Sequence, residues 1–351
     1  MAKKLMKGNE AMSAAAINAG CRFFFGYPIT PQNEIPEYMS RELPKVGGSF
    51  IQAESEVSAI NMVYGAAGCG ARVMTSSSSP GMALKQEGIS YIAGAELPCI
   101  IINVTRGGPG LGGIQPSQAD YFQATRGGGN GDYYMPVYAP ATVQEAVDLI
   151  GKGFDVADQY RTPVMLLVDG MIGQVMEPVE ISENLQRKEF DKSWATTTTK
   201  NERSPNIINS LYLKPEELEL HCEKLFKKYD EIKEKEVMSE TVGLDEAEIV
   251  LVAYGTTARI AKNVIKSLEK EGIKAGLIRP ITVWPFPYDD IKNLNPGVKN
   301  ILVVEMSMGQ MIEDVRLGNE GRRPVHFYGR TGGMIPAPED IIKKVKEIVG
   351  R

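Results

Sequence analysis

The stretch GYPITPQNEIPEYM, from Gly26 to Met39, directly follows the apolar run Phe23–Phe25. The run favours a β-strand and the stretch ends in a helical pattern, so together they predict a strand, a turn and a helix. The first two prolines bracket a dipeptide that ends in Thr30. Each proline fixes its own φ at about −65° and pushes the residue before it toward extended backbone. Tyr27 and Thr30 therefore have little freedom, either in a plain connection capped by Thr30 or Asn33 or in a rigid loop that meets a ligand.

The composition is that of an ordinary globular protein. Of 351 residues, 43% are hydrophobic and 24% are charged, and this length can form two domains. The net charge of −5 means that the chain has no overall excess of positive charge, which nucleic-acid binding would require. No apolar run approaches the roughly 20 residues that a membrane span needs, and the first residues turn polar before a signal-peptide core could form. We expect a cytoplasmic protein that binds neither nucleic acid nor a membrane.

The cysteines and histidines give little support to metal or histidine chemistry. The four cysteines are far apart and form no C-x-x-C pair: Cys21, Cys69, Cys99 and Cys222. This spacing predicts neither an iron–sulfur cluster nor a zinc site of the usual kind on this chain. Cys99 lies in an apolar strand pattern, which predicts a buried thiol. His221, on a charged helix, and His326, at a strand end, are interpreted as structural.

Alternating strand and helix patterns extend from the first strand in both directions along the chain. Expected helices lie at 9–19, 32–43, 54–68, 81–93 and 143–157, and expected strands at 50–52, 72–75, 98–102 and 163–168. A second, smaller run has strands at 249–253, 275–278 and 301–305 and helices at 257–270 and from 338 onward. Such alternation predicts an α/β fold with a doubly wound parallel sheet, followed by a second α/β domain.

Residues 181–245 differ in composition, with many Lys and Glu residues and a run of threonines. Within them, apolar residues recur at steps of four and three, as along one side of an amphipathic helix: Leu218, Cys222, Leu225, Tyr229 and Ile232. We therefore predict a first domain at 1–180, a linker with an amphipathic helix at 181–245, and a second domain at 246–351.

A glycine-rich loop, TRGGPGLGG from Thr105 to Gly113, follows the strand at 98–102 and contains a G-x-G-x-x-G register. No helical pattern begins after it, so the helix N-terminus that would hold a pyrophosphate is missing, and we do not expect NAD here. Glycines also let a loop lie close to a ligand or a partner chain. Arg106 stands at the end of the strand, where it could clamp a carboxylate or form an ion pair that ties down the loop.

A third stretch, QAESEVSAIN from Gln52 to Asn61, begins a helix with two acids. The helix dipole alone favours acids at this end, so each has a plain structural explanation. Glu56, however, is followed by Ala59, Ile60 and Val63 on or near its own side of the helix. A carboxyl group in such apolar surroundings is desolvated and tends to share a proton. That property suits a group that passes a proton to a cofactor ring.

These stretches occur in an order that resembles the α subunit of the 2-oxoacid:ferredoxin oxidoreductases. The shared motifs are G-Y-P-I-T-P, the S-E pair at Ser55 and Glu56, S-S-S-P-G at Ser77–Gly81, and T-R-G-G-P-G after the fourth strand. The likeness extends over essentially the whole chain and includes Val283–Pro287. Details such as PITPQNEIPEYM and QPSQADYFQA are most similar to the branched-chain members, which act on 3-methyl-2-oxobutanoate.

The resemblance implies a fold and a set of partners. The first domain would be the pyrimidine-binding half of a thiamine diphosphate site, and the second would be transketolase-C-terminal-like. A β subunit would hold the diphosphate and Mg²⁺, and γ and δ subunits would take part, with [4Fe–4S] clusters on partner chains. Coenzyme A would accept the acyl group and ferredoxin the electrons. The diphosphate motif G-D-G is incomplete here, since Asp169 is preceded by Val168, so we interpret Asp169 as part of a strand-end turn.

The resemblance also implies roles for individual residues. Glu56 would hydrogen-bond N1′ of the aminopyrimidine, so that the C2 proton of the thiazolium can be removed. The residues beside the cofactor would be Glu56, Pro28, Ile29 and Thr30, and those beside the substrate would be Tyr27, Thr30 and Arg106. Pyruvate or 2-oxoglutarate as the substrate, a transketolase-like or indolepyruvate-type enzyme, and a non-catalytic subunit remain alternatives. The joint presence of Glu56, Thr30 and Arg106 argues against the last.

Overall fold

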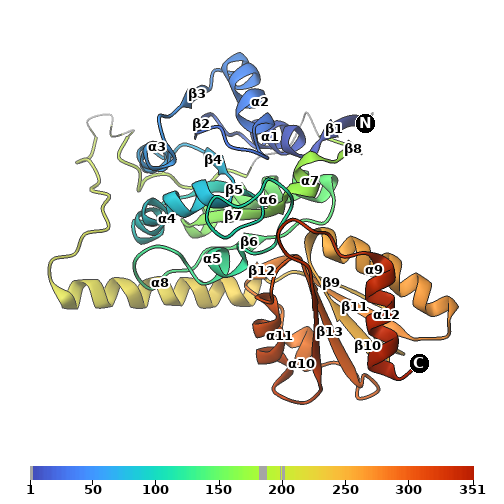
Figure 1. Ribbon diagram of the computed structural model, residues 1–351. Helices are drawn as coiled ribbons and strands as arrows, with labels where there is room; N and C mark the ends of the chain where they lie inside the picture. The colour runs from blue at the N-terminus through green and yellow to red at the C-terminus, as the bar shows by residue number, and fades with distance from the viewer. Residues whose placement is uncertain (1–2, 182–187, 198, 200–201) are drawn as a thin grey trace.

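The computed structural model describes residues 3–181, 188–197, 199 and 202–351, and Figure 1 shows two α/β units. The first unit is built on a seven-stranded sheet. In spatial order its strands are β12 (Thr282–Trp284), β6 (Val137–Tyr138), β7 (Pro163–Asp169), β5 (Cys99–Thr105), β4 (Val73–Ser77), β2 (Phe23–Gly26) and β3 (Ser49–Gln52). All neighbours are parallel except β12, which pairs antiparallel with β6.

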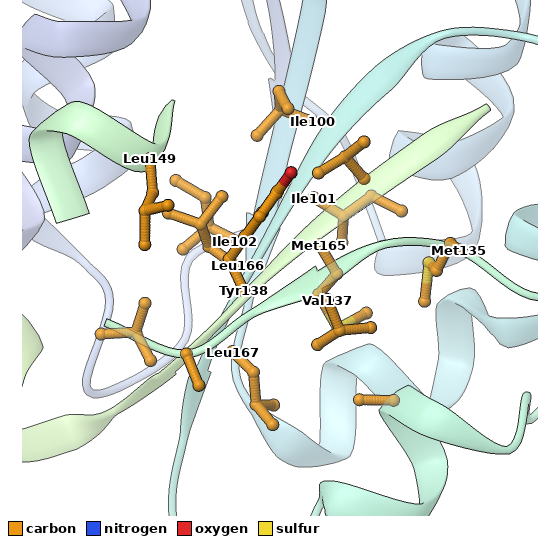
Figure 2. Packing of buried hydrophobic residues seen from close by; sticks show 14 of the residues in the cluster. Ile100, Ile101, Ile102, Met135, Val137, Tyr138, Leu149, Met165, Leu166 and Leu167 are labelled. Atoms are coloured by element: carbon orange, nitrogen blue, oxygen red, sulfur yellow. The ribbon is translucent and has the colours of Figure 1, made fainter. Parts of the chain in front are cut away.

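Helices cover both faces of this sheet, as the doubly wound fold predicts. On one face α1 (Gly8–Asn18) packs against α2 (Glu34–Glu42) and α6 (Val143–Tyr160), and on the other α3 (Glu56–Gly68) packs against α4 (Ser79–Gly94). Strands β5 and β7 are buried along their whole length, which explains why they are continuously apolar. Figure 2 shows this core, in which Ile100–Ile102 of β5 and Met165–Leu167 of β7 lie beside Val137 and Tyr138 of β6.

The second unit has a five-stranded sheet. Its strands, in spatial order, are β14 (Val325–Gly329), β13 (Asn300–Glu305), β10 (Ile249–Val252), β11 (Ala275–Pro280) and β9 (Ser239–Val242), of which only β9 is antiparallel to its neighbour. Helices α9 (Gly255–Lys270) and α12 (Pro338–Val349) enclose a separate core on one face. The opposite face, with α10 (Tyr288–Lys292) and α11 (Met311–Asn319), continues into the core of the first unit.

The two units are interlocked. Strand β12 lies in the second half of the sequence, yet it extends the first sheet through β6. The Gln118 side chain donates to the Tyr254 carbonyl at 2.8 Å and accepts from the Met306 N–H at 2.9 Å. The backbone N–H of Gln118 donates to the Met306 carbonyl at 2.8 Å. The second unit is therefore fixed against the loops of the first.

The remaining elements bind the ends of these units together. Strands β1 (Lys4–Lys7) and β8 (Met176–Val179) form a small antiparallel sheet, and the short helices are η1 (Leu43–Val46), α5 (Tyr121–Thr125) and α7 (Gly170–Gln174). The predicted amphipathic helix is α8 (Pro215–Lys235), the long yellow helix at the lower left of Figure 1. Its buried side begins after Leu218, which is exposed, and consists of Leu225, Tyr229 and Ile232. No helix in the described part of the chain combines the length and apolar character that a membrane crossing requires.

Candidate active site

The residues that the sequence singles out come together at one edge of the first sheet. Parallel strands end on the same side, and open α/β sheets bind ligands there. The turn 27–31 follows β2, Glu56 follows β3, and Arg106 follows β5. The end of β4, between them, continues directly into α4.

Glu56 is the first residue of α3 and is only 6% exposed. Ser55 caps the helix by accepting from the Ser58 N–H at 3.2 Å, which fixes the direction in which Glu56 leaves the backbone. The carboxylate lies directly over Gly81 of α4. A Cβ added at Gly81 would stand 2.3 Å from Glu56 Oε1 and 2.3 Å from Ser77 Oγ. With any other residue at position 81, this carboxylate or the Ser77 hydroxyl would have to shift.

The polar atoms around Glu56 lack the partners that buried groups normally have. No residue in the described part of the chain donates a hydrogen bond to its carboxylate. The hydroxyls of Ser77 and Ser78 are buried and have no partner among the described residues either. Buried polar groups are nearly always paired in folded proteins, so such a cluster requires a separate explanation, of which a bound ligand is one.

Lys85 is a residue of this cluster that sequence reasoning missed. It lies one helical turn after Gly81, is fully buried, and donates to Thr75 Oγ1 at 2.6 Å and to the Ser76 carbonyl at 3.1 Å. Burial lowers the pKa of Lys85 to about 7, against the opposing charges of Glu56 and Cys99. Lysines on helices are usually solvent-exposed. Local sequence gives no signal for this burial, which results from the packing of α4 against β4.

Arg106 is buried and joins two loops. Its Nη1 donates to the Thr30 carbonyl at 2.9 Å and its Nη2 to the Leu111 carbonyl at 3.0 Å, while Nε is buried without a partner among the described residues. Its backbone N–H donates to Ser79 Oγ at 3.0 Å, which links it to the start of α4. Hydrogen bonds from Arg106 to carbonyls thus tie the loop down, and no described residue forms an ion pair with Arg106. The structure brings Arg106 and Thr30 together.

Gln32, a second residue that the sequence analysis overlooked, holds the turn after β2 from the buried side. Gln32 is fully buried, accepts from Ser76 Oγ at 2.5 Å and donates to the Tyr27 carbonyl at 3.2 Å. Tyr27, Pro28 and Thr30 are exposed and Ile29 is half-buried. The turn therefore has a fixed backbone and presents its side chains to solvent.

A pocket of about 420 Å³ opens beside Thr30. Four separate segments of the chain line it: Thr30, Pro31, Asn33, Glu34, Ile114, Gln115, Pro116, Gly170, Met171, Gln174 and Ile335. Neither Glu56 nor Arg106 is a lining residue. The glycine loop that follows Arg106 folds back on itself, with the Gly113 N–H donating to the Gly107 carbonyl at 2.8 Å. No helix begins within residues 107–120. This agrees with the prediction that the loop is not a dinucleotide fingerprint.

The other titratable residues of interest have structural roles. Asp169 caps α7 and accepts from Met171 and Ile172 N–H, and also from the backbone and hydroxyl of Thr256 in the second unit. Burial raises the pKa of Cys99 to about 12. His221 Nε2 lies 2.7 Å from the Gly94 carbonyl, and His326 Nε2 lies 3.0 Å from Asn300 Oδ1.

Comparisons with known proteins are consistent with this geometry. A family model described as "Pyruvate flavodoxin/ferredoxin oxidoreductase, thiamine diP-bdg" matches residues 14–240, and "Pyruvate:ferredoxin oxidoreductase core domain II" matches residues 247–341. The chain is 48% identical over 350 residues to "Ketoisovalerate oxidoreductase subunit VorB" of Methanothermobacter thermautotrophicus, covering 100% of this chain and 99% of that protein. It is 37% identical to "2-oxoglutarate synthase subunit KorA" of Methanocaldococcus jannaschii, covering 98% of this chain and 100% of the relative.

Solved structures give the same result for the fold. The 2-oxoglutarate:ferredoxin oxidoreductase from Magnetococcus marinus matches with a TM-score of 0.86 and 29% identity, and the match covers 98% of this chain and 65% of that one. A split-gene transketolase matches in fold alone, with a TM-score of 0.62 and 15% identity over 98% of each chain. The chain therefore belongs to the thiamine diphosphate-dependent 2-oxoacid:ferredoxin oxidoreductase family, as one of its subunits.

Proposed function

We propose that this chain is the α-type subunit of an enzyme that oxidatively decarboxylates 3-methyl-2-oxobutanoate, forming acyl-coenzyme A and CO₂ and reducing ferredoxin. The ketoisovalerate relatives are 48% and 49% identical, against 34% to 38% for the 2-oxoglutarate synthase subunits and 28% for a pyruvate synthase subunit. The observation that supports the chemistry is the buried carboxylate of Glu56, which no group of the described chain satisfies.

The residues around Glu56 fit the pyrimidine ring of thiamine diphosphate. That ring carries nitrogen acceptors and an amino donor, and the cluster offers a carboxylate and the unpaired hydroxyls of Ser77 and Ser78. Gly81 lets the Glu56 carboxylate lie close against α4, because a Cβ at that position would stand 2.3 Å from Glu56 Oε1. Glu56, Ser77 and Ser78 are therefore the residues we expect to hold the ring.

When bound, thiamine diphosphate supplies the carbon nucleophile that attacks the 2-oxo carbon and lets CO₂ leave. Glu56 holds a proton at N1′ of the pyrimidine and exchanges it with the ring. The side chain is only 6% exposed, and a carboxyl group beside the ring nitrogen is suited to general acid–base catalysis. Helix α3 orients the carboxylate through the Ser55 cap, so little freedom is lost when the ring binds.

Arg106 is bonded both to Ser79 at the start of α4 and to Thr30, which lines the neighbouring pocket. Two guanidinium nitrogens of Arg106 donate to backbone carbonyls. Its Nε has no partner among the described residues and can donate to a bound anion. We propose that Arg106 fixes the substrate carboxylate while Thr30 and Tyr27, whose side chains are exposed, line the entry. Pro28 and Ile29 complete the cofactor side of the turn.

The diphosphate half of the site would come from a partner. Asp169, the one acid at the position of a partial diphosphate motif, is fully occupied by Thr256 and by the start of α7. We therefore propose a β subunit that holds the diphosphate and its Mg²⁺, together with γ and δ subunits, and [4Fe–4S] clusters on partner subunits that pass the electrons to ferredoxin. The relatives are themselves named as subunits, which supports a complex.

Two measurements test this proposal. Calorimetry should detect only weak thiamine diphosphate binding to the full chain alone and tight binding after a β subunit is added; micromolar or better affinity for the lone chain would contradict it. Steady-state rates of the assembled complex should be highest, as kcat/KM, for 3-methyl-2-oxobutanoate, compared with pyruvate and 2-oxoglutarate. A preference for 2-oxoglutarate would instead favour the activity named for the Magnetococcus marinus structure.

A further inference from the structure

The outer side of α3 and α4 is almost free of charge. The two helices lie side by side on the left of the first unit in Figure 1, and both lie wholly within the described residues. Residues 57–71, which include nearly all of α3, have no charged side chain. On α4 Lys85 is buried, which leaves Glu87 as the one exposed charge. By contrast, α2 on the opposite face of the sheet exposes Glu37 and Arg41, as surface helices normally do on their solvent side.

Apolar side chains are exposed there instead. Val57 and Met62 of α3 are 45% and 37% exposed, and Leu84 and Tyr91 of α4 are 56% and 41% exposed. Together with two further exposed residues of α3 they form what we call the α3–α4 face: Val57, Asn61, Met62, Gly65, Leu84 and Tyr91. A surface that combines exposed large apolar side chains with few charges is typical of one that another chain covers.

The linker extends this apolar surface past the far ends of the two helices. The Ile208 Cδ1 lies 3.9 Å from the position of a Cβ at Gly68, and the Ser210 Cβ lies 3.3 Å from one at Gly94. Beside these contacts Ile207 is 88% exposed and Leu211 is 71% exposed. The apolar surface therefore continues from the α3–α4 face onto the linker.

Gly65 has no explanation within the described chain. It lies in the interior of α3, four residues after Asn61 and eight after Val57, and so on the same side of the helix. Its φ is negative, and a Cβ there would meet nothing within 4 Å. Glycine destabilises a helix interior relative to alanine, so neither backbone conformation nor a neighbouring group requires it here. A glycine at this position would, however, let a helix of another chain lie close against α3.

We propose that the α3–α4 face is the docking surface for the chain that supplies the diphosphate half of the cofactor site, the β subunit. The inference rests on the proposed function, in which the cofactor is shared between two chains. The partner that fits this face presents an uncharged, largely apolar surface to it, because a charge buried there would find no counter-charge.

The position of the face identifies its occupant. Val57 directly follows Glu56, and Leu84 lies three residues after Gly81, against which the Glu56 carboxylate lies. The face therefore begins where we expect the pyrimidine ring. A cofactor held by two chains requires both within the length of one molecule, so the chain that holds the diphosphate must cover the surface beside Glu56. Two copies of this chain would instead bring together two pyrimidine sites and no diphosphate site.

The first test is Gly65→Leu in the full chain. Leucine is a better helix former than glycine and has open space at this position, so the Tm of the chain alone should rise. The same side chain would keep a helix of the β subunit away from α3, so the Kd for the β subunit, measured by calorimetry, should rise about tenfold or more. Asn263→Leu, at an exposed position of α9, is the control and should change the Kd by about twofold or less.

The second test, Met62→Glu, places a charge within the face. In the chain alone the carboxylate stays in water, so the Tm should be nearly unchanged. In the complex it would be buried without a partner, so the Kd for the β subunit should again rise about tenfold or more. Leu317→Glu on α11 is the matched control, because Leu317 is 64% exposed and lies in the second unit. It should change the Kd by about twofold or less.

A third measurement separates docking from chemistry. Neither change alters Glu56, so hydrogen–deuterium exchange at C2 of thiamine diphosphate should return to the parental rate in both variants once the β subunit is saturating. Exchange that stays slow at saturation would overturn the docking role.

The remaining outcomes distinguish the occupants and the two proposals. Sedimentation velocity of the chain alone tests a second copy as occupant: self-association that Gly65→Leu abolishes, with an unchanged Kd for the β subunit, would overturn the inference. Parental Kd values in both variants would also overturn it, and would leave the proposed function intact if the β subunit still tightens cofactor binding to the parent. If it does not, the proposed function fails and the inference with it. Raised Kd values in both variants, with unchanged controls, support the inference.

Discussion

Two buried glutamates stand at the carboxyl ends of the two parallel sheets, and their surroundings are opposite. Glu305, at the end of β13, accepts from the backbone N–H groups of Gln310, Met311 and Ile312 at 3.0 to 3.1 Å and from the Ser307 hydroxyl at 2.9 Å. Burial raises the pKa of Glu305, although these donors act in the other direction. Glu56 has no such donors among the described residues.

The difference separates a carboxylate that is satisfied within the fold from the carboxylate that we propose for the cofactor. Glu305 gathers the free N–H groups at the start of α11 and so completes the second unit without external help. Glu56 is also buried, at 6% exposed, but no described residue donates a hydrogen bond to its carboxylate. Burial alone would have ranked the two acids together; their hydrogen-bond partners separate them.

The largest expected effect on stability is at the satisfied acid. Glu305→Gln replaces an acceptor by an amide that cannot serve all these donors, and it should lower the free energy of unfolding by about 3 kcal/mol or more. Glu56→Gln breaks no bond within the described chain and should change stability by about 0.5 kcal/mol or less. Denaturant unfolding of both variants of the full chain would compare them. Equal losses would remove the distinction on which the site assignment depends.

The next effect concerns Arg106. Arg106→Ala removes charge-assisted hydrogen bonds worth about 1.5 to 3 kcal/mol, so kcat/KM should fall roughly ten- to hundredfold in the assembled complex. Thr30→Val removes only a neutral hydroxyl and should have a milder effect of the same kind. Steady-state kinetics with 3-methyl-2-oxobutanoate would measure both. A KM raised less than twofold at normal turnover would mean that Arg106 merely braces its two loops.

A pair of glycines offers a sharper contrast on neighbouring helices. Gly81→Ala would drive a methyl group to within 2.3 Å of Glu56 Oε1, so we expect a loss of about 1 to 3 kcal/mol and displacement of the carboxylate. Gly65→Ala, on α3, meets nothing within 4 Å and should stabilise the helix by about 0.5 to 1 kcal/mol. Thermal unfolding of the full chain would compare them. Equal Tm changes in the two variants would show that the space over Gly81 is not tight.

Local patterns in the sequence predicted most of the framework. The strands and helices predicted from strong periodicities agree within a few residues with β2 through β5, β7, α1 through α4, α6 and α8. These elements could be predicted because each buries an apolar side that repeats along its own sequence. Strand β12 was missed because it has three residues and its partner, β6, lies far away in the sequence. Helix α11 was also not predicted, since it has no strong pattern of its own.

The candidate site was only partly visible in the same way. Glu56, Thr30 and Arg106 are marked by motifs beside strand ends, where ligands bind in this class of fold. Lys85 and Gln32 could not be chosen from local sequence, because their burial results from α4, β2 and β4 packing around them. The same holds for the absence of hydrogen-bond donors at Glu56 within the described residues, which only the packed structure reveals.

The most direct test of the account is the rate of C2 hydrogen exchange of thiamine diphosphate in the assembled complex. Glu56→Gln keeps the size of the side chain but cannot hold or pass the shared proton, so exchange should slow by about 10²- to 10⁴-fold while the cofactor still binds. Glu54→Gln is the matched control, because Glu54 lies two residues earlier and is exposed, and it should leave the rate near that of the parent. Equal exchange rates in Glu56→Gln and the parent would contradict the assignment of this carboxylate to the cofactor.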